Sequence, residues 1–449
     1  MASSSRPRVL VVGGGFAGLS AVRGLSGAEA DLVLIDRCNH HAFQPLLYQV
    51  ATAGLASPSI AAPLRHILRN QRNVTVLLGA AHSIDVDARH VDVDGVTHIY
   101  DYLVVATGST HAYFGHDEWA RYAPGLKTLE DALDIRARIL TAFERAEAAE
   151  DSQDRAAWLT FLIIGGGATG VELAGTLAEI ARHTLKREFR RIDPASAKIL
   201  LIEAGPRVLP AFPETLSLKA RQQLERLGVI VRAGRPVTHL DARGVALGDE
   251  SIRARTVLWA AGVAASPLGA ALGAGSDRTG RVPVTANLSI ARHPEVFVAG
   301  DLACPPPECG SIPAIAPAAK QMGRYCARAI RSALAGRPLT PFRYRHHGSL
   351  ATIGRMAAVA DFGRIRLSGL IAWWVWLTAH VYFLIGFRNR LVVLIDWAEA
   401  YWSYRRGARI IFSAQRALDS AGAPEAGSPR QNRDARGTDP RSAPRADHA

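Results

Sequence analysis

Two glycine-rich stretches with the same spacing lie about 150 residues apart in this chain. Residues 13–18 read GGGFAG, residues 165–170 read GGGATG, and each stretch follows a run of apolar residues. Glycines spaced in this way allow a tight turn between a strand and a helix and leave the backbone open to a pyrophosphate. The N-terminus of the following helix offers free N–H groups and the positive end of its dipole. The repeated pattern therefore predicts two dinucleotide sites in one chain.

An acidic residue ends the strand that follows each glycine stretch. Asp36 lies 18 residues after Gly18, close to the spacing of about 20 that is usual for a ribose-binding carboxylate. Glu203 lies 33 residues after Gly170, and we expect residues 184–193 to extend the intervening helix. Because a carboxylate repels a 2′-phosphate, Glu203 favours NADH over NADPH, although the nearby Arg207 keeps NADPH open. The alternative is that both pairs are loop glycines beside ordinary strand-end acids.

The surrounding elements indicate an α/β chain in which one nucleotide-binding unit is interrupted by another. The runs at 102–108 (YLVVATG) and 256–262 (TVLWAAG) each predict a buried strand that closes a unit. Residues 296–301 (VFVAGD) predict a further strand that returns to the first unit. A resumed first unit with a late Gly300-Asp301 pair suits a tightly held FAD, and the inserted unit then suits exchangeable NADH. An isolated Gly-Asp pair is equally compatible with a simple turn.

Composition narrows the class of partner. The chain has 449 residues, which is too long for one compact core, and a net charge of +13. Since the body of the chain contains no compact block of Lys and Arg, anionic lipid or an anionic cofactor is favoured over nucleic acid. Strand-like sequence begins by Arg8, which leaves no room for a signal peptide. We find no pattern of metal ligands in the sequence.

The four cysteines include one pair with redox spacing. Cys304 and Cys309 are separated by four residues, as in some flavin disulfide reductases, but three of those four are proline. The pair also comes late in the chain rather than just after the first unit. Free thiols in a reducing compartment are therefore favoured over a redox disulfide.

Residues 367–387 form an uncharged apolar run that holds three of the eight tryptophans. Its length is sufficient to span a bilayer, but Arg364, Arg366, Arg388 and Arg390 flank it on both sides and give no orientation bias. Residues 391–411 are amphipathic and contain Trp397, Tyr401, Trp402 and Tyr404, residue types suited to the headgroup zone. We interpret 364–412, with seven arginines against Asp396 and Glu399, as a monotopic membrane-docking region. A spanning helix and a buried dimer core are the alternatives.

The motifs together resemble the type II, or alternative, NADH:quinone oxidoreductases. The resemblance covers most of positions 8–410 and includes the motifs VVGGGFAGL, HHAFQPLLYQVATAGL, IIGGGATGVELAG, LIEAGPRVLPAFP and VFVAGDLA. It implies two Rossmann-like domains of the FAD/NAD-linked reductase type and a C-terminal helical membrane-docking region. It also implies a non-covalent FAD, NADH as electron donor, a membrane quinone (ubiquinone or menaquinone) as acceptor, and no proton pumping.

On this basis we expect an FAD-binding domain at 1–120 and 281–345, an NADH-binding domain at 121–280, a membrane-anchoring region at 346–412 and a disordered tail at 413–449. The resemblance assigns FAD to Gly13, Gly15, Phe16, Ala17, Gly18, Asp36, Arg37, Thr107, Gly108, Gly300 and Asp301. It assigns NADH to Gly165, Gly167, Ala168, Thr169, Gly170, Glu203, Ala261 and Gly262. It also implies a homodimer on the cytoplasmic face of the inner membrane of a bacterium.

Two further residues are expected to act in catalysis. Glu172, two residues after Gly170, corresponds to a glutamate that the family places at the junction of NADH, flavin and quinone. The alternative for Glu172 is an acid in the first helical turn that stabilises the helix dipole. The family's quinone motif A-Q-x-A-x-Q reads here from Ala316 to Gln321, with Pro317 in place of the first glutamine. We expect Ala316, Pro317 and Gln321 to face the quinone, with one amide fewer than the family pattern.

Two other functions remain open at this stage. A sulfide:quinone oxidoreductase would share the fold, but it needs cysteines near the flavin and has no use for a second nucleotide site. A membrane flavoprotein that senses NADH with little turnover is the third possibility.

Overall fold

The computed structural model describes residues 6–384, 387–403 and 406–411. The expectations for Tyr404 and for the tail at 413–449 fall outside these residues. The side chains of Arg388, Tyr401 and Trp402 are likewise not described.

The first nucleotide-binding unit is built on a six-stranded sheet with the order β20-β21-β9-β1-β2-β5. The central strands are parallel and buried on both faces, which explains their continuous apolar sequences. The late strand β21 pairs with β9, so the chain does return to its first sheet. The strands are β1 (Arg8–Val12), β2 (Asp31–Asp36), β5 (Val74–Leu78), β9 (Tyr102–Val105), β20 (Ser289–Ile290) and β21 (His293–Val298).

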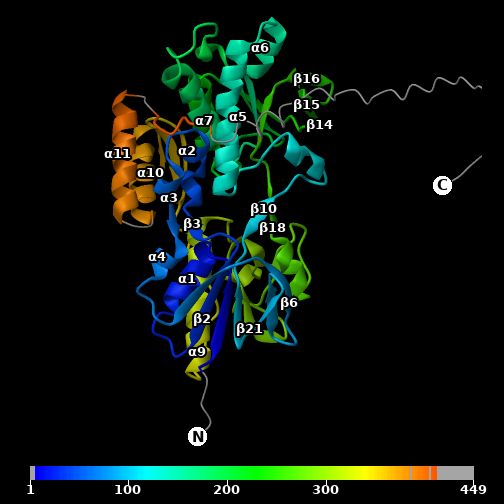
Figure 1. The fold of residues 1–449 in the computed structure, drawn as a ribbon, viewed down its shortest axis with the longest axis vertical. Coiled ribbons are helices and arrows are strands. Elements are labelled where there is room, and N and C mark those ends of the chain that lie inside the picture. The colour runs from blue at the N-terminus through cyan, green and yellow to red at the C-terminus, as the bar shows by residue number, and fades with distance from the viewer. Residues whose placement is uncertain (1–5, 385–386, 404–405, 412–449) are drawn as a thin grey trace, which may run out of the picture.

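The second unit has a smaller, fully parallel sheet with the order β13-β12-β11-β17. Its strands are β11 (Thr160–Ile164), β12 (Lys198–Glu203), β13 (Val229–Ala233) and β17 (Thr256–Trp259). The chain passes between the two units along β10 (Ser109–His111) and β18 (Val263–Ala265), which pair with each other in antiparallel fashion. Figure 1 shows this two-stranded ribbon between the lower and upper lobes.

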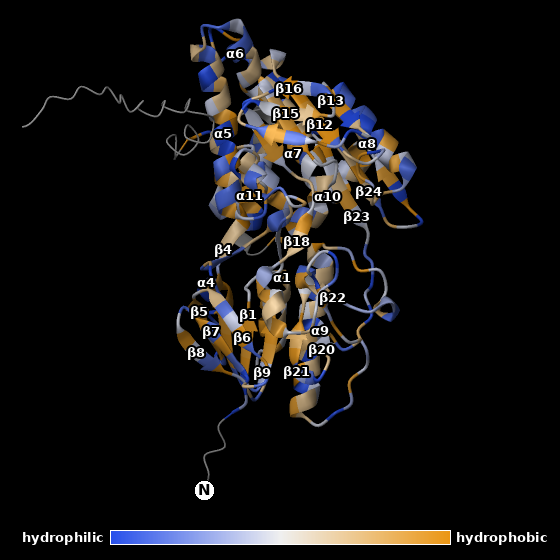
Figure 2. Ribbon diagram, turned by 90° about the vertical axis from the view of Figure 1, so that its right-hand side faces the viewer, coloured by the Kyte–Doolittle hydropathy of each residue, from blue (hydrophilic) through white to orange (hydrophobic). Residues whose placement is uncertain are grey.

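Helices cover both sheets, and the strands in Figure 2 are accordingly the most hydrophobic elements. In the first unit, α1 lies along α9, and in the second, α7 follows β11. The helices are α1 (Phe16–Gly24), α2 (Leu47–Ala51), α3 (Ser57–Ile60), α4 (Leu64–Leu68), α5 (Leu129–Ala148), α6 (Ser152–Trp158), α7 (Ala168–Glu179), α8 (Glu214–Arg226) and α9 (Ala316–Leu334).

Short strands form the remaining ladders of the two lobes. They are β3 (His40–Ala42) with β4 (Ala61–Pro63), β6 (Ala81–Asp85) with β7 (His90–Val93) and β8 (Val96–Ile99), β14 (His239–Asp241) with β15 (Gly244–Leu247) and β16 (Glu250–Arg253), and β19 (Val282–Pro283) with β22 (Ala303–Cys304).

The C-terminal region is a three-stranded antiparallel sheet followed by two helices. The elements are β23 (Ser349–Gly354), β24 (Ala357–Asp361), β25 (Arg366–Ser368), α10 (Leu370–Phe383) and α11 (Phe387–Ser403). Strand β23 packs directly on α7: a side chain at Gly175 would place its Cβ 1.5 Å from the carbonyl oxygen of Ile353. Figure 1 shows α10 and α11 side by side on one flank of the molecule, next to α2 and α3.

Three local expectations from the sequence are wrong. Residues 184–193 do not extend the helix, because a π turn over Ile180–Thr184 follows α7 and the later backbone N–H groups of Arg190, Arg191 and Ile192 bond to the Glu147 carboxylate. The apolar run at 367–387 begins in β25, so its helix starts only at Leu370. The aromatic and polar stretch 40–55 lacks a clear period and so predicts a loop, but it contains β3 and α2. Among the described residues, no helix combines the length and apolar character needed to cross a bilayer.

Candidate active site

The first glycine turn has the shape of a pyrophosphate cradle. Gly13 has a φ of +104°, and a Cβ there would lie 2.4 Å from the carbonyl oxygen of Ala106. A Cβ on Gly18 would lie 1.8 Å from the carbonyl oxygen of Gly13. By contrast, a Cβ on Gly15 would meet no described atom within 4 Å. Two glycines therefore allow the chain to pack, while the third leaves open space in front of the start of α1, where Phe16 and Ala17 begin the helix.

Asp36 ties the end of β2 to this turn. One carboxylate oxygen accepts the Gly14 N–H at 2.5 Å, and the other accepts the Cys38 N–H at 2.7 Å. Each oxygen keeps a lone pair that can accept a ribose hydroxyl. Arg37, which follows Asp36, is exposed to solvent.

The second turn repeats this geometry closely. A Cβ on Gly165 would lie 2.5 Å from the Ala260 backbone and one on Gly170 would lie 1.8 Å from the Gly165 carbonyl oxygen, whereas Gly167 again faces open space. Glu203 accepts the N–H groups of Gly166 and Gly205, each at 2.6 Å. Ala168 and Thr169 form the first turn of α7.

Arg207 does not reach toward Glu203 in this structure. Its guanidinium donates to the carbonyl oxygens of Phe212, at 2.7 Å, and Pro210, at 3.0 Å. At the end of β17, Gly262 has a φ of +83°, and a Cβ there would lie 2.4 Å from the Phe114 ring. Ala261 precedes it at the same edge of the second sheet.

A polar cluster closes the first turn from the returning part of the chain. Asp301 accepts the Ser109 hydroxyl at 2.8 Å, and the Lys127 ammonium lies 3.9 Å from the same carboxylate oxygen and donates to Ser109 at 2.9 Å. Burial lowers the pKa of Lys127, and the Asp301 carboxylate opposes that shift. Gly300, with a φ of +77°, donates its N–H to the Met322 sulfur at 3.1 Å and so fixes Asp301 against α9.

Two buried polar atoms beside the first turn have no hydrogen-bond partner within the described part of the chain. They are Thr107 Oγ1 and His41 Nε2. Thr107 follows β9 and precedes Gly108, which has a φ of +70°. Unpaired buried polar atoms are costly, and the open space at Gly15 lies in the same turn. The residues present therefore fit a dinucleotide cofactor.

Glu172 is buried in the second turn of α7, with 9% of its surface exposed. The alternative of a first-turn acid is therefore wrong, since the first turn of α7 holds no acidic residue. Burial raises the pKa of Glu172 to about 8, and a hydrogen bond from the Thr352 backbone opposes that shift. Glu172 therefore keeps a proton near neutral pH, which an exposed glutamate does not.

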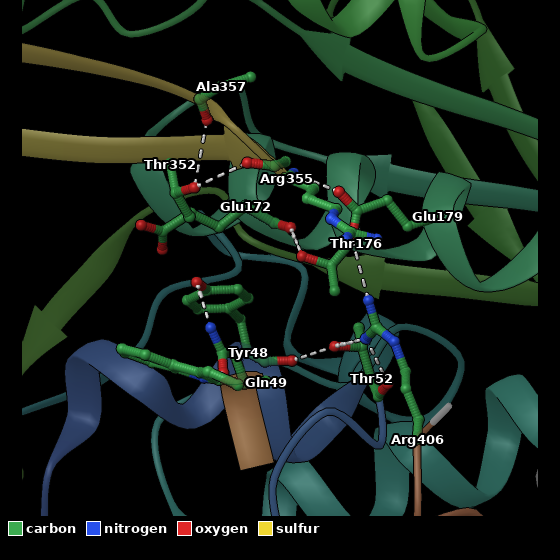
Figure 3. A network of polar contacts seen from close by, with 12 residues as sticks. Tyr48, Gln49, Thr52, Glu172, Thr176, Glu179, Thr352, Arg355, Ala357 and Arg406 are labelled. Carbon is green, nitrogen blue, oxygen red and sulfur yellow. Dashed lines mark hydrogen bonds and ion pairs between the residues drawn. The ribbon is translucent and has the colours of Figure 1, made fainter. Parts of the chain in front are cut away.

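Residues distant in sequence surround Glu172, and Figure 3 shows how they converge. The Tyr48 hydroxyl accepts a hydrogen bond from Gln49 Nε2 at 2.9 Å. Figure 3 shows this hydroxyl on the side of the Tyr48 ring that faces Glu172. Burial, and then the Glu172 charge, raise the pKa of Tyr48 well above its usual value. Gln49 is in turn held by the Trp397 indole N–H at 2.7 Å. The second nucleotide unit, the 40–55 stretch and helix α11 thus meet at one place.

A cavity of about 110 Å³ lies beside Tyr48 and Gln49, and Glu179 and Arg406 also line it. The ion pair between these two residues holds the segment after α11 against α7. Arg406 lies 3.1 Å from Glu179 and donates to the Thr52 carbonyl oxygen at 2.9 Å. Glu179 also accepts the Arg355 backbone N–H. The sequence did not predict roles for Tyr48, Ser109, Lys127 and Arg406 at this site. Of these four residues, only Tyr48 lies in one of the quoted family motifs, HHAFQPLLYQVATAGL.

The N-terminus of α9 begins at Ala316, with Pro317 at its second position. The Gln321 amide donates to the Arg345 carbonyl oxygen at 2.8 Å and accepts the Arg345 N–H at 3.0 Å. In this structure both ends of that amide are bound to backbone, so a role for Gln321 toward a quinone stays a prediction.

Aromatic rings connect the first glycine turn with the C-terminal helices. The Phe16 ring contacts His41 and Phe43 edge to face, and Phe43 lies 6.1 Å from the His380 ring on α10. Burial lowers the pKa of His380 to about 4, so this histidine is neutral.

All four cysteines are free thiols, and the expected absence of a Cys304–Cys309 disulfide agrees with the structure.

Comparisons with known proteins identify the family. A model described as pyridine nucleotide-disulphide oxidoreductase matches residues 7–323, and one described as the NDH2 C-terminal domain matches residues 346–405. The chain is 43% identical to the type II NADH:quinone oxidoreductase Ndh of Mycobacterium tuberculosis, and the alignment covers 91% of each protein.

Solved structures show the same fold. NDH2 from Plasmodium falciparum in complex with NADH is 19% identical and superposes with a TM-score of 0.81 over 91% of this chain and 100% of that chain. The sulfide:quinone oxidoreductase of Aquifex aeolicus is also 19% identical, with a TM-score of 0.65 over 86% of this chain and 92% of that chain. At these identities both similarities concern the fold alone. With two matching glycine turns, a family model over most of the chain and a relative of 43% identity, the chain belongs to the type II NADH:quinone oxidoreductase family.

Proposed function

We propose that this protein oxidises NADH through a bound FAD and reduces a membrane quinone by two electrons, without pumping protons. The observation that carries the proposal is the pair of matching dinucleotide turns, each with an open cradle and a bonded strand-end carboxylate. FAD, when bound, supplies the redox chemistry between the two substrates. The protein's residues bind the nucleotides, exclude water and hold protons.

The first turn is proposed to hold FAD. Asp36 would bind a ribose, the backbone around Gly15 would face the pyrophosphate, and Thr107 and Asp301 would bind the chain that joins the phosphates to the ring. The Lys127 ammonium beside Asp301 adds positive charge at this place. Two parts of the chain that are far apart in sequence meet at this turn, since β21 pairs with β9 and Asp301 accepts the Ser109 hydroxyl. This supports a resident FAD at the first turn and an exchangeable NADH at the second.

The second turn is proposed to hold NADH, with Glu203 on a ribose. Glu203 is negatively charged at the place where a 2′-phosphate would lie, and Arg207 is engaged in its own loop. The arrangement therefore supports NADH over NADPH. We propose that Glu172 keeps and delivers a proton where NADH, flavin and quinone meet, and its pKa, raised to about 8 by burial, supports this role.

The quinone is proposed to approach from the side of α10 and α11. Exposed apolar side chains gather on these two helices: Leu370, Ile371, Trp374, Tyr382, Phe383, Leu391, Leu394 and Ile395 are each at least 40% exposed. Exposed apolar side chains concentrated on two neighbouring helices support contact with a membrane or partner. We propose peripheral docking on the cytoplasmic face of a bacterial inner membrane, a homodimer, and a quinone site at Ala316, Pro317 and Gln321.

A sulfide:quinone reaction is not favoured. Its similarity to this chain concerns the fold, and Cys304 and Cys309 are not joined. The second dinucleotide turn, with Glu203 in place, would have no purpose in that reaction.

The test is an anaerobic titration of the purified protein with NADH, followed by a short-chain quinone. We expect the flavin absorbance to bleach with NADH and to return when ubiquinone or menaquinone analogues are added. NADPH serves as the matched control and should bleach the flavin far more slowly. A protein without flavin, or a flavin that NADH does not reduce, would refute the proposal.

A further inference from the structure

A large basic crevice lies on the outer side of α1 and reaches the start of that helix at Phe16. Its volume is about 1270 Å³, and α1, α4, α9, the end of α10 and the start of α11 contribute to its walls. Six side chains that carry or can carry positive charge near neutral pH line it: Arg23, His66, Arg69, Lys320, Arg324 and Arg390. His41 also lines it but is neutral, because burial lowers its pKa to about 4. Among the described lining residues there is no carboxylate.

These positive groups are only partly neutralised by the protein. Arg23 and Arg324 are exposed on neighbouring turns of α1 and α9, and Arg69 is bonded to His66, itself a potential cation. Lys320 is sandwiched between aromatic rings, with its ammonium 5.2 Å from the Phe16 centroid and 5.0 Å from that of Phe383. Burial, and then the charges of Arg324 and Arg23, lower the pKa of Lys320 to about 8. An anion in the crevice would relieve this repulsion.

The same crevice opens onto the exposed apolar surface of the C-terminal helices. Tyr382 and Phe383 line it and are 69% and 46% exposed. Arg390 connects α11 to the end of α10 by donating to the carbonyl oxygens of Leu384, at 2.9 Å, and Tyr382, at 2.8 Å. A ligand that fits must therefore carry negative charge at one end and apolar groups at the other.

We propose that this crevice binds the headgroup of an anionic phospholipid. The phosphate lies among Arg23, Lys320 and Arg324, and the acyl chains leave past Tyr382 and Phe383 into the bilayer. At a membrane surface, each Lys or Arg near a phosphate strengthens its binding. The inference rests on the docking of α10 and α11 proposed above, and it adds a lipid preference to it.

The chain offers a direct probe of the crevice, because Lys320 is one of only five lysines. The holoenzyme is mixed with vesicles of phosphatidylcholine alone, with vesicles that also contain phosphatidylglycerol, or with inorganic phosphate. Acetylation of each lysine is then measured by peptide mass mapping. We expect the phosphatidylglycerol vesicles to protect Lys320 about tenfold more than the neutral vesicles, while Lys219, exposed on α8, serves as internal control.

A double substitution tests the partners of Lys320. Arg23→Gln with Arg324→Gln should reduce the preference for phosphatidylglycerol about tenfold or more, since two cations are lost. The control, Arg226→Gln with Arg278→Gln, removes the same charge from exposed positions outside the crevice and should keep the preference. NADH:quinone activity in detergent, measured on the same samples, should be unchanged in both.

Each other outcome has a defined meaning. Equal protection by neutral vesicles would overturn the lipid site while leaving membrane docking intact. Protection by inorganic phosphate alone would indicate a soluble anion site and overturn the proposal. Absence of binding to any vesicle, with detergent activity intact, would refute the lipid site and the docking but not the NADH:quinone reaction.

Discussion

The two dinucleotide turns are nearly superimposable in their local contacts, yet the rest of the chain encloses them differently. In both, a strand-end carboxylate accepts two backbone N–H groups at 2.5 to 2.7 Å, and the middle glycine of the cradle faces open space. The first turn is closed by the returning β21, by Asp301 and by α9. The second turn leads instead to buried Glu172 on α7. The proposed difference between a resident FAD and an exchangeable NADH therefore depends on the elements around each turn and not on the turn itself.

The strongest test of this comparison fills each cradle with the same side chain. The variants are Gly15→Val and Gly167→Val. Gly15 and Gly167 have φ angles of −68° and −69°, which valine tolerates, and a Cβ at either position would meet no described protein atom within 4 Å. We expect Gly15→Val to lose FAD and essentially all activity. Gly167→Val should keep the yellow colour and raise the KM for NADH by about tenfold or more, because only the approach of a pyrophosphate is blocked. Loss of flavin in Gly167→Val would reverse the assignment of the two sites.

The second test concerns the buried carboxyl of Glu172, which belongs to the second nucleotide-binding unit. Glu172→Gln should lower kcat by about tenfold to a hundredfold without loss of FAD. The titration of a group near pH 8 should also disappear from the pH profile of kcat. Flavin loss in this variant would instead assign Glu172 a structural role.

The raised pKa of Glu172 should also make the stability of the folded protein depend on pH. The folded-state pKa of Glu172, about 8, lies above its ordinary value of 4.5, so the unfolded chain releases this proton first. The folded state therefore loses stability as the pH rises from about 4.5 to 8. Glu172→Gln should remove this loss, and its melting temperature relative to the parent should be higher at pH 9 than at pH 5.

The third test examines the carboxylate of the second turn. Glu203→Gln keeps one oxygen for the backbone but removes the negative charge. We expect kcat/KM for NADH to fall by about tenfold and the preference over NADPH to narrow by a similar factor. Steady-state kinetics with both nucleotides measure this, and an unchanged preference would show that Glu203 does not discriminate at the 2′ position.

The smallest effect is expected at Gln321. Because its amide is bonded to both backbone groups of Arg345, Gln321→Met should cost about 1 to 2 kcal/mol of unfolding free energy. The KM for quinone should rise only modestly, because the Arg345 backbone competes with the quinone for this amide. An unchanged KM for quinone would remove Gln321 from the proposed quinone site.

Local sequence was sufficient to predict the fold class and both turns, since strand, glycine spacing and acid lie within one βαβ unit. The family matches confirm the fold class, the cofactors and the NADH:quinone activity. Sequence was insufficient wherever the partner lies far along the chain. Nothing around Lys127 indicates Asp301, and nothing in α7 indicates Arg406 as the partner of Glu179.

The errors have a similar origin. In the apolar run at 367–387, the first residues belong to β25, whose pairing with β24 supplies their backbone hydrogen bonds. Gly369, with a φ of +72°, separates this strand from α10. Residues 184–193 are helix-compatible by composition, but the Glu147 carboxylate on α5 captures three of their N–H groups. In both cases a tertiary partner outcompetes the local preference. The domain limits and individual site residues remain predictions.

Two ion pairs after α11 limit how far the protein can be shortened. Arg406 and Arg409 reach back from the far end of the helical hairpin to Glu179 and Glu188. A chain that stopped after Ser403 would keep both helices yet leave the largely buried Glu179 carboxylate without its cation, at the end of the same helix that carries Glu172. Cleavage a few residues before Arg406 would therefore disturb α7, so a fused reporter belongs beyond Ile411.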